Sequence, residues 1–79
     1  MKDEKMNYER AKIFCDKQLV VHISKRDGIY YNGIITEVSD LFFFLEDKED
    51  GKQLIFFKEL SRQIEEYKEV EEDDINRRN

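Results

Sequence analysis

Four short apolar runs, separated by turns and charged stretches, constrain the fold of this chain more than any other feature of its sequence. Asp27-Gly28 follows the first run and Asp50-Gly51 precedes the last, and Asp-Gly is typical of tight turns between antiparallel strands. Every run is shorter than the roughly 20 apolar residues of a membrane-spanning helix. The pattern therefore predicts a mainly β domain with runs at Leu19–Ile23, Ile29–Val38, Leu41–Leu45 and Leu54–Phe57.

The size and composition of the chain limit it to one small domain. Of its 79 residues, 42% are charged, so the core has to come from these concentrated apolar runs. A domain of this size buries only about 60% of the surface that its unfolded chain exposes, so its core must be compact or shared with other subunits. We expect residues 1–67 to form the folded domain and the charged residues 68–79 to form a disordered tail.

The segment before the first apolar run is predicted to be a helix. Asp3 to Asp16 contains no Gly or Pro and is rich in helix formers, and Asp3 is a suitable N-cap. A set of side chains at helical spacing is expected to cover one end of the sheet. This set consists of Met6, Arg10 with its aliphatic stem, Ile13 and Phe14.

From Leu19 onward the spacing of apolar residues changes from helical to alternating, as in a strand. Asn32-Gly33 interrupts the longest run and is either a turn between two strands or a bend within one. We favour the bend, because small barrels need glycine or a bulge where a long strand turns a corner. The predicted strands are Leu19–Ser24, Ile29–Val38, Leu41–Leu45, Gln53–Lys58 and Arg62–Tyr67. A helix followed by five such strands is typical of SH3-like and OB-like small barrels.

Phe42, Phe43 and Phe44 are consecutive, so they place apolar groups on both faces of their strand. One face is expected to be core. The other face must be covered by a helix, another sheet or another subunit, or it must stack against nucleobases. The sequence favours burial and leaves base stacking open.

Charge and reactive residues argue against several functions. The net charge of −5 does not suit a general polyanion binder. Cys15 is the one cysteine and His22 the one histidine, so we expect neither an internal disulfide nor a cysteine-based zinc site. Neither residue has a catalytic partner at a recognisable spacing. We predict a protein without enzymatic activity, metal or cofactor.

Two charged segments are interpreted as turns. The run from Glu46 to Gly51 lacks the alternating ligands and distant Glu of a calcium-binding loop, so it is expected to be a solvated hairpin turn. Lys25-Arg26 could contact phosphate, but a solubilising loop tip is favoured. No apolar stretch resembles a signal peptide or a membrane helix, and we expect a cytoplasmic location without membrane contact.

The order of elements and several residues resemble the Sm/LSm family, which includes bacterial Hfq. The family's first motif has a glycine opening its second strand, a second glycine at the bend, and then a loop with Asp, an aromatic residue and Asn. Gly28 and Gly33 match this frame, and Asp40 and Phe42 look like the loop's Asp and base-stacking residue. Asp40 falls one residue late relative to Gly33, and Phe44 stands where the RNA-contacting Asn would be.

The family's second motif, near the last turn, commonly has a basic residue followed by Gly, or Lys-His in the Hfq branch. Lys58 retains the basic residue, but Glu59 follows it. The resemblance covers Lys5 to Tyr67 in architecture and only a handful of positions in identity. It implies a strongly bent five-stranded antiparallel Sm-like barrel with an N-terminal helix.

The resemblance also implies a function. Sm-like proteins form hexameric or heptameric rings in which strand four of one subunit pairs with strand five of the next. Single-stranded RNA, with U-rich RNA as a candidate, binds at loops facing the pore. The chain would accordingly be a homo-oligomeric, non-catalytic RNA-binding module. The site residues carried over are Ser39, Asp40, Phe42, Lys58 and Arg62.

An alternative from another class stays open. The same barrel could bind a protein partner through its strand edges and its aromatic strand, without binding RNA. This interpretation accounts more easily for the acidic net charge and for the departures from the RNA-binding motifs.

Overall fold

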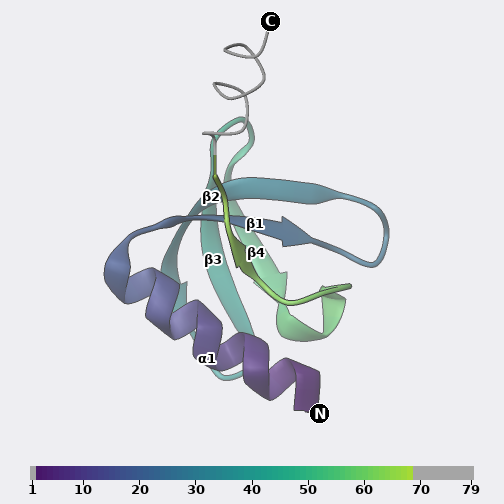
Figure 1. Ribbon diagram of the computed structural model, residues 1–79. Helices are drawn as coiled ribbons and strands as arrows, with labels where there is room; N and C mark the ends of the chain where they lie inside the picture. Colours follow the sequence, from purple (N-terminus) through teal and green to yellow (C-terminus); the bar gives the residue numbers. More distant parts are fainter. Residues whose placement is uncertain (1, 69–79) are drawn as a thin grey trace, which may run out of the picture.

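The computed structural model describes residues 2–68 and contains one helix followed by five strands (Figure 1). The predicted tail at residues 68–79 lies outside the described residues, apart from Lys68. The elements are α1 (Lys2–Lys17), β1 (Val20–Ser24), β2 (Tyr30–Val38), β3 (Phe42–Asp47), β4 (Gly51–Phe56), a 3-10 turn η1 (Phe57–Glu59) and β5 (Glu65–Glu66). Within residues 2–68, no helix is both long enough and apolar enough to cross a membrane.

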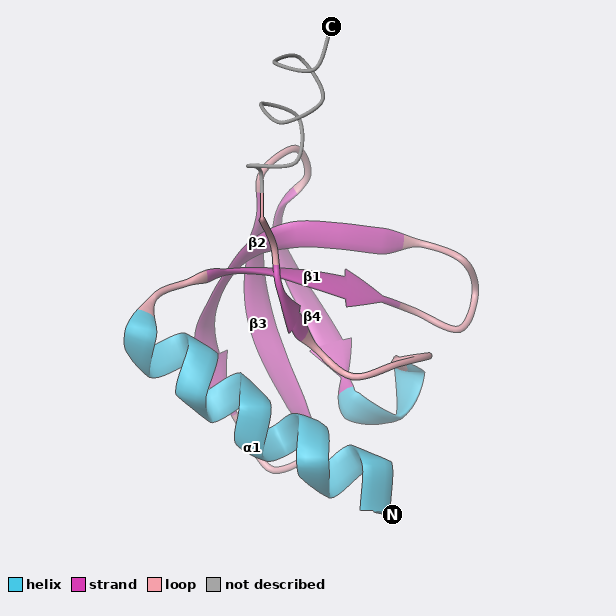
Figure 2. Cartoon of the chain, viewed as in Figure 1, coloured by secondary structure: helices cyan, strands magenta, loops and turns pink. Residues whose placement is uncertain are grey.

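The five strands form one antiparallel sheet in the order β4-β3-β2-β1-β5. The sheet is strongly bent, and α1 lies against it from one side (Figure 2). This arrangement confirms the predicted fold class, an N-terminal helix followed by a bent five-stranded sheet. The strands β4 and β5 are the two edges of the sheet, and each has one side without a strand partner among the described residues.

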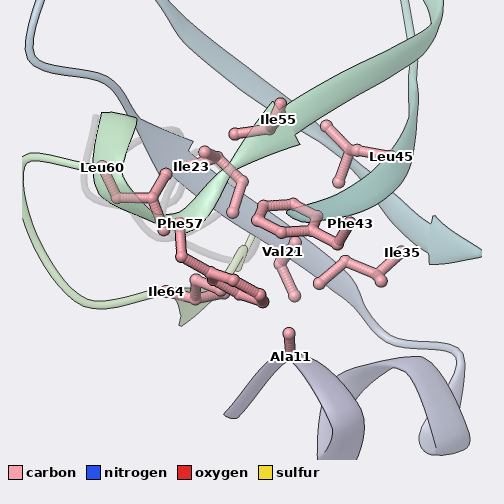
Figure 3. Packing of buried hydrophobic residues seen from close by; sticks show 10 residues of the cluster. All are labelled: Ala11, Val21, Ile23, Ile35, Phe43, Leu45, Ile55, Phe57, Leu60 and Ile64. Atoms are coloured by element: carbon pink, nitrogen blue, oxygen red, sulfur yellow. The ribbon is translucent and has the colours of Figure 1, made fainter. Parts of the chain in front are cut away.

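The core lies between the concave side of the sheet and α1 (Figure 3). Phe43 is fully buried, and its ring centroid lies 5.2 Å from that of Phe57. Alternation along β3 places Phe43 and Leu45 in the core while Phe42 and Phe44 lie on the opposite face. The buried apolar residues are Ala11, Val21, Ile23, Ile35, Phe43, Leu45, Ile55, Phe57, Leu60 and Ile64.

The face of α1 that packs on the sheet differs in part from the predicted face: Phe14 packs against the core and Arg10 contacts Ile64, as expected, but the other two predicted residues face outward. Met6 and Ile13 are 45% and 52% exposed, whereas Asn7 and Ala11 are buried. The reason is a polar anchor. The backbone N–H of Ile64 donates to Asn7 Oδ1 (2.9 Å), and Arg10 Nε donates to the Ile64 carbonyl (2.6 Å). These bonds turn the helix so that a polar residue lies inward.

Helix α1 ends at a left-handed residue that is not glycine. Gln18 has φ 56°, and the N–H of Leu19 donates to the Phe14 carbonyl while that of Gln18 donates to Cys15 (both 3.2 Å). This pattern is a Schellman motif, which usually has glycine at the left-handed position. The side chain of Gln18 also donates to the Cys15 carbonyl (2.8 Å), which helps a residue with a side chain to hold this conformation.

Strand β2 is continuous through Gly33, so Asn32-Gly33 is not a turn. A Cβ at Gly33 would overlap the backbone carbonyl of Glu46 on β3, so this position requires glycine for close strand approach. Three residues further, the pairing of β2 with β3 shifts between Ile35 and Glu37. Thr36 is therefore an extra residue on β2, a bulge that adds one residue between Gly33 and the following turn.

Both glycine-containing turns form, with boundaries that differ from those predicted. Lys25 and Ile29 close a three-residue β1–β2 turn that ends in Gly28, which has φ 91°. Strand β3 extends to Asp47 and β4 begins at Gly51, so the charged connection is a three-residue β3–β4 turn. Strand β5 covers only two of the six residues predicted for it.

The β3–β4 turn is a hairpin turn as predicted, but it is organised by one buried carboxylate and is not solvated throughout. Asp47 is 9% exposed. Its Oδ2 accepts the N–H groups of Glu49 (2.9 Å) and Asp50 (2.8 Å), and its Oδ1 accepts that of Asn32 on β2 (3.0 Å). Burial alone would raise the pKa of Asp47, but these three donors outweigh it and lower that pKa below its ordinary value.

Candidate nucleic-acid interface

The β2–β3 turn carries three of the predicted site residues. The N–H of Ser39 donates to the Phe42 carbonyl (2.8 Å), which closes the turn, and Asp40 and Leu41 are exposed at its tip. Asp40 lies beside the first turns of α1, where it lines a shallow pocket of about 360 Å³. Glu4, Lys5, Tyr8 and Glu9 complete this pocket, so three carboxylates and one ammonium group surround it.

Lys58 lies next to this turn because η1 is hydrogen-bonded to it. The N–H of Phe57 donates to the Leu41 carbonyl (2.9 Å), and Phe57 itself is buried in the core. Lys58, the next residue of the 3-10 turn, is exposed. The structure therefore brings the β2–β3 turn and Lys58 to the same end of the sheet.

Phe42 is half-buried on the outer face of the sheet, away from the core. Its ring lies 5.7 Å from that of Phe44 and 5.7 Å from that of Phe56, both in edge-to-face geometry. Leu54, on β4, adds a 45% exposed side chain. We call Phe42, Phe44, Leu54 and Phe56 the outer aromatic patch. Such a surface can stack against a base or cover a protein partner.

Arg62 stands apart from the other predicted residues. Its carbonyl accepts a long hydrogen bond from Asn7 Nδ2 (3.4 Å), and its side chain is exposed. Among residues 2–68, its guanidinium has no ion pair or hydrogen bond. The structure provides no contact that joins Arg62 to Asp40, Phe42 or Lys58.

The β1–β2 turn, interpreted from the sequence as a solubilising loop tip, contributes basic residues next to η1. Lys25 and Leu60 form a β-bridge, and the N–H of Arg26 donates to the Glu59 carbonyl (2.8 Å). Lys25, Arg26 and Lys58 thus lie around one pocket of about 310 Å³, together with Asp27 and Glu59. We call Lys25, Arg26 and Lys58 the basic cluster. The separation of 32 positions between Arg26 and Lys58 hides this proximity from the sequence.

Lys25 has a different environment from the other two members of the basic cluster. Its side chain is 17% exposed, and Nζ lies 3.1 Å from Glu59 Oε1 and 3.7 Å from Asp27 Oδ2. The hydrogen bond to Glu59 raises the pKa of Lys25 above its ordinary value, against the opposing effect of burial. Arg26 and Lys58 form no ion pair with any described residue.

His22 lies on β1 in a hydrogen-bonded position. With Nδ1 protonated, His22 donates to Asn32 Oδ1 (2.6 Å), and the Ser24 hydroxyl donates to its Nε2 (3.3 Å). Both ring nitrogens are therefore occupied within the sheet. Among residues 2–68, no group of three or more His, Cys, Asp or Glu side chains is arranged to hold a metal ion.

Comparisons with known proteins identify the fold. No protein-family model matches the sequence, and no curated protein matches it. Among solved structures, a crystal structure described as the pleiotropic translational regulator Hfq matches with a TM-score of 0.63 and 19% sequence identity. The match covers 72% of this chain and 92% of that one. The helix, the bent antiparallel sheet and this similarity together show that the chain has the Sm-like fold.

Proposed function

We propose that this chain is a non-catalytic, cytoplasmic RNA-binding module of the Sm-like type that works as a homo-oligomeric ring, a hexamer or a heptamer. The observation that carries the proposal is the hydrogen bond from Phe57 to Leu41, which joins the β2–β3 turn to η1. Because of it, Phe42 and Lys58, the aromatic and basic residues carried over from the family's two motifs, lie at one end of the sheet.

The bulge at Thr36 strengthens the match with the family's first motif. Asp40 stands one residue later after Gly33 than the motif requires, and a bulge in β2 absorbs one residue without moving the turn along the sheet. The spacing difference is thus compatible with a turn in the family's position. The second departure, Phe44 in place of Asn, is not compensated, since Phe44 lies in the outer aromatic patch.

In the proposed complex, single-stranded RNA, with U-rich RNA as the first candidate, binds at the β2–β3 turn and η1. Phe42 stacks on a base, and Lys58 contacts the backbone. Ser39 and Asp40 offer hydroxyl and carboxylate oxygens at the turn, and Arg62 adds positive charge. Repetition of Lys58 around a ring concentrates positive charge that the net charge of −5 of one subunit conceals.

The sheet edges support assembly into a ring. Strand β4 carries exposed Lys52 and Leu54 at one edge, and β5 carries exposed Glu65 and Glu66 at the other. An antiparallel pairing of β4 with β5 of the next copy would remove both unpaired edges and bring opposite charges together. Pairing of two β5 edges would instead oppose like charges.

The first test is native mass spectrometry of the full chain, alone and with a short U-rich RNA. A closed hexamer or heptamer that gains the mass of RNA supports the proposal. Lys58→Ala and Phe42→Ala should each weaken RNA binding about tenfold, which corresponds to about 1.4 kcal/mol. A strict monomer that ignores RNA contradicts the proposal.

The outer aromatic patch and the acidic net charge favour one alternative, a protein-interaction module on the same fold. In that case the patch and the strand edges bind a partner chain. This alternative would be favoured if the ring does not bind RNA and if Lys58→Ala still binds the protein partner.

A further inference from the structure

The β1–β2 turn is held against the last residue of η1 and the segment that follows it by three hydrogen bonds to backbone carbonyls. The N–H of Arg26 donates to the Glu59 carbonyl (2.8 Å), and that of Ser61 donates to the Ser24 carbonyl (2.9 Å). These two bonds form the β-bridge between Lys25 and Leu60, and the Ser61 hydroxyl donates to the same Ser24 carbonyl (3.2 Å). The tip of this turn is therefore a fixed part of the structure, and its side chains start from defined backbone positions.

The guanidinium of Arg26 is oriented by a hydrogen bond to the backbone of Lys58. Arg26 Nε donates to the Lys58 carbonyl (3.0 Å), although the side chain is exposed. A guanidinium has five N–H groups, so this bond leaves the four on its terminal nitrogens, which have no partner among residues 2–68. An arginine held in this way loses less conformational entropy when it binds an anion than a freely rotating one does.

Within the pocket lined by the basic cluster, both carboxylates lie close to Lys25, and neither forms an ion pair with Arg26 or Lys58. Five charged residues line the pocket of about 310 Å³, three of them cations and two of them carboxylates. Lys25 lies close to both carboxylates, at 3.1 Å from Glu59 and 3.7 Å from Asp27. Arg26 and Lys58 keep their positive charges exposed, in a chain of net charge −5.

We propose that Arg26 and Lys58 together bind one backbone phosphate of single-stranded RNA, with Lys25 as the residue that neutralises the neighbouring carboxylates. This inference rests on the proposed function and extends it from the β2–β3 turn to the β1–β2 turn. The terminal nitrogens of Arg26 donate two parallel hydrogen bonds to phosphate oxygens, and the ammonium of Lys58 adds a third contact. RNA is favoured over an acidic protein because one guanidinium and one ammonium line a small pocket at η1, and η1 is hydrogen-bonded through Phe57 to Leu41, the residue before Phe42.

The test is fluorescence anisotropy of a labelled oligouridine against the full chain, over a range of salt concentrations. Arg26→Ala should weaken binding at least about tenfold, since a charge-assisted pair of hydrogen bonds is lost. The slope of log affinity against log salt should fall by about 0.7, as expected for one phosphate contact with a single strand. The matched control is Lys12→Ala, which removes one exposed charge from α1 and should change affinity less than twofold.

Two further variants separate binding from folding. Arg26→Gln removes the charge but keeps an N–H that can donate to the Lys58 carbonyl, so its thermal unfolding should match that of the wild type while RNA binding still falls. Arg26→Lys restores the charge without the fork and should recover only part of the affinity. Arg26→Ala and Lys58→Ala combined should lose less than the two separate losses multiplied, because both contact one phosphate.

The outcomes distinguish this inference from the proposed function. Lys58→Ala could weaken RNA binding while Arg26→Ala and Arg26→Gln bind RNA like the wild type. That result would rule out the phosphate site at Arg26 and leave the proposed function standing. A wild-type chain that binds no RNA at low salt overturns both. Competition by polyglutamate as effective as that by RNA would show an acidic protein site instead, and competition by inorganic phosphate alone, at equal phosphate concentration, would show a site for a free anion.

Discussion

The β3–β4 turn and the β1–β2 turn are both rich in charge, but they use it in opposite ways. In the β3–β4 turn, Asp47 is buried and its oxygens accept three backbone hydrogen bonds. In the β1–β2 turn, Lys25 pairs with two carboxylates while Arg26 remains exposed beside Lys58. The first turn uses its charge to hold the chain, and the second leaves charge available for a ligand. Similar charge density in a sequence therefore says little about which charges can bind.

The largest expected effect is on the strand that supports the β3–β4 turn. Gly33→Ala should lower the free energy of unfolding by about 3 kcal/mol or more, because the new Cβ overlaps the backbone of Glu46 and neither strand can shift freely. Urea denaturation measures this change. Thr36→Ala, at the exposed bulge of the same strand, is the control and should stay within about 0.5 kcal/mol of the wild type. A Gly33→Ala variant as stable as the wild type would refute the requirement for glycine.

The next effect tests whether the Asp47 carboxylate serves the fold. Asp47→Asn should lower the free energy of unfolding by about 1–3 kcal/mol, because an amide has one acceptor oxygen and cannot accept all three N–H groups. Asp50→Asn, in the same turn, removes an exposed charge and should be nearly neutral. If both variants lose the same stability, the effect is one of net charge and not of these hydrogen bonds.

The pH dependence of stability should follow from the same carboxylate. Since the pKa of Asp47 is lower in the folded state than its ordinary value of about 3.9, its contribution to the free energy of unfolding is complete above that value. It is lost as the pH falls below about 4 and through the folded-state pKa. The free energies of unfolding of the wild type and of Asp47→Asn, measured by urea denaturation at a series of pH values, should therefore converge toward low pH. If the two plots of unfolding free energy against pH stay parallel down to about pH 2, groups other than Asp47 cause the loss of stability in acid.

The smallest expected effect concerns the β1–β2 turn. Glu59→Gln keeps an acceptor for the Phe56 N–H but removes the charge that faces Lys25. The free energy of unfolding should fall by only about 0.5 kcal/mol, since the pair is partly exposed. RNA affinity should rise about two- to fivefold at low salt, because the basic cluster loses a carboxylate. Asp16→Asn, an equal charge change on α1, should leave the RNA affinity unchanged. If Asp16→Asn raises the affinity as much as Glu59→Gln does, the effect comes from net charge and not from the basic cluster.

Much of the fold could be predicted because it depends on local patterns. Alternating apolar residues indicated strands close to their observed positions, and the Asp-Gly sequences at Gly28 and Gly51 indicated turns that form. The buried face of α1 could be predicted only in part, because Asn7 is held inward by a bond to the backbone of Ile64, 57 positions away. The spacing of apolar residues along a helix does not identify a hydrogen-bond partner elsewhere in the chain.

The candidate site was predictable only in part. Asp40, Phe42 and Lys58 were taken from a family resemblance, and the structure brings their segments together through the Phe57–Leu41 hydrogen bond. Arg62 has no contact with them among the described residues. The sequence allows a phosphate contact at Lys25-Arg26 and favours a solubilising loop tip. The orientation of the Arg26 side chain could not be predicted, because it depends on the Lys58 carbonyl, 32 positions along the chain.

The sequence by itself determined the class of the fold, the order of its elements and the inward and outward alternation of β3, since these follow from residues within a few positions of one another. Only the tertiary structure decided which charges are buried, which face of the helix packs inward, and which cations are left exposed. The physical reason is that burial and pairing depend on the distances between segments, and a backbone carbonyl from a distant turn directs a side chain as strongly as any neighbour in the sequence does.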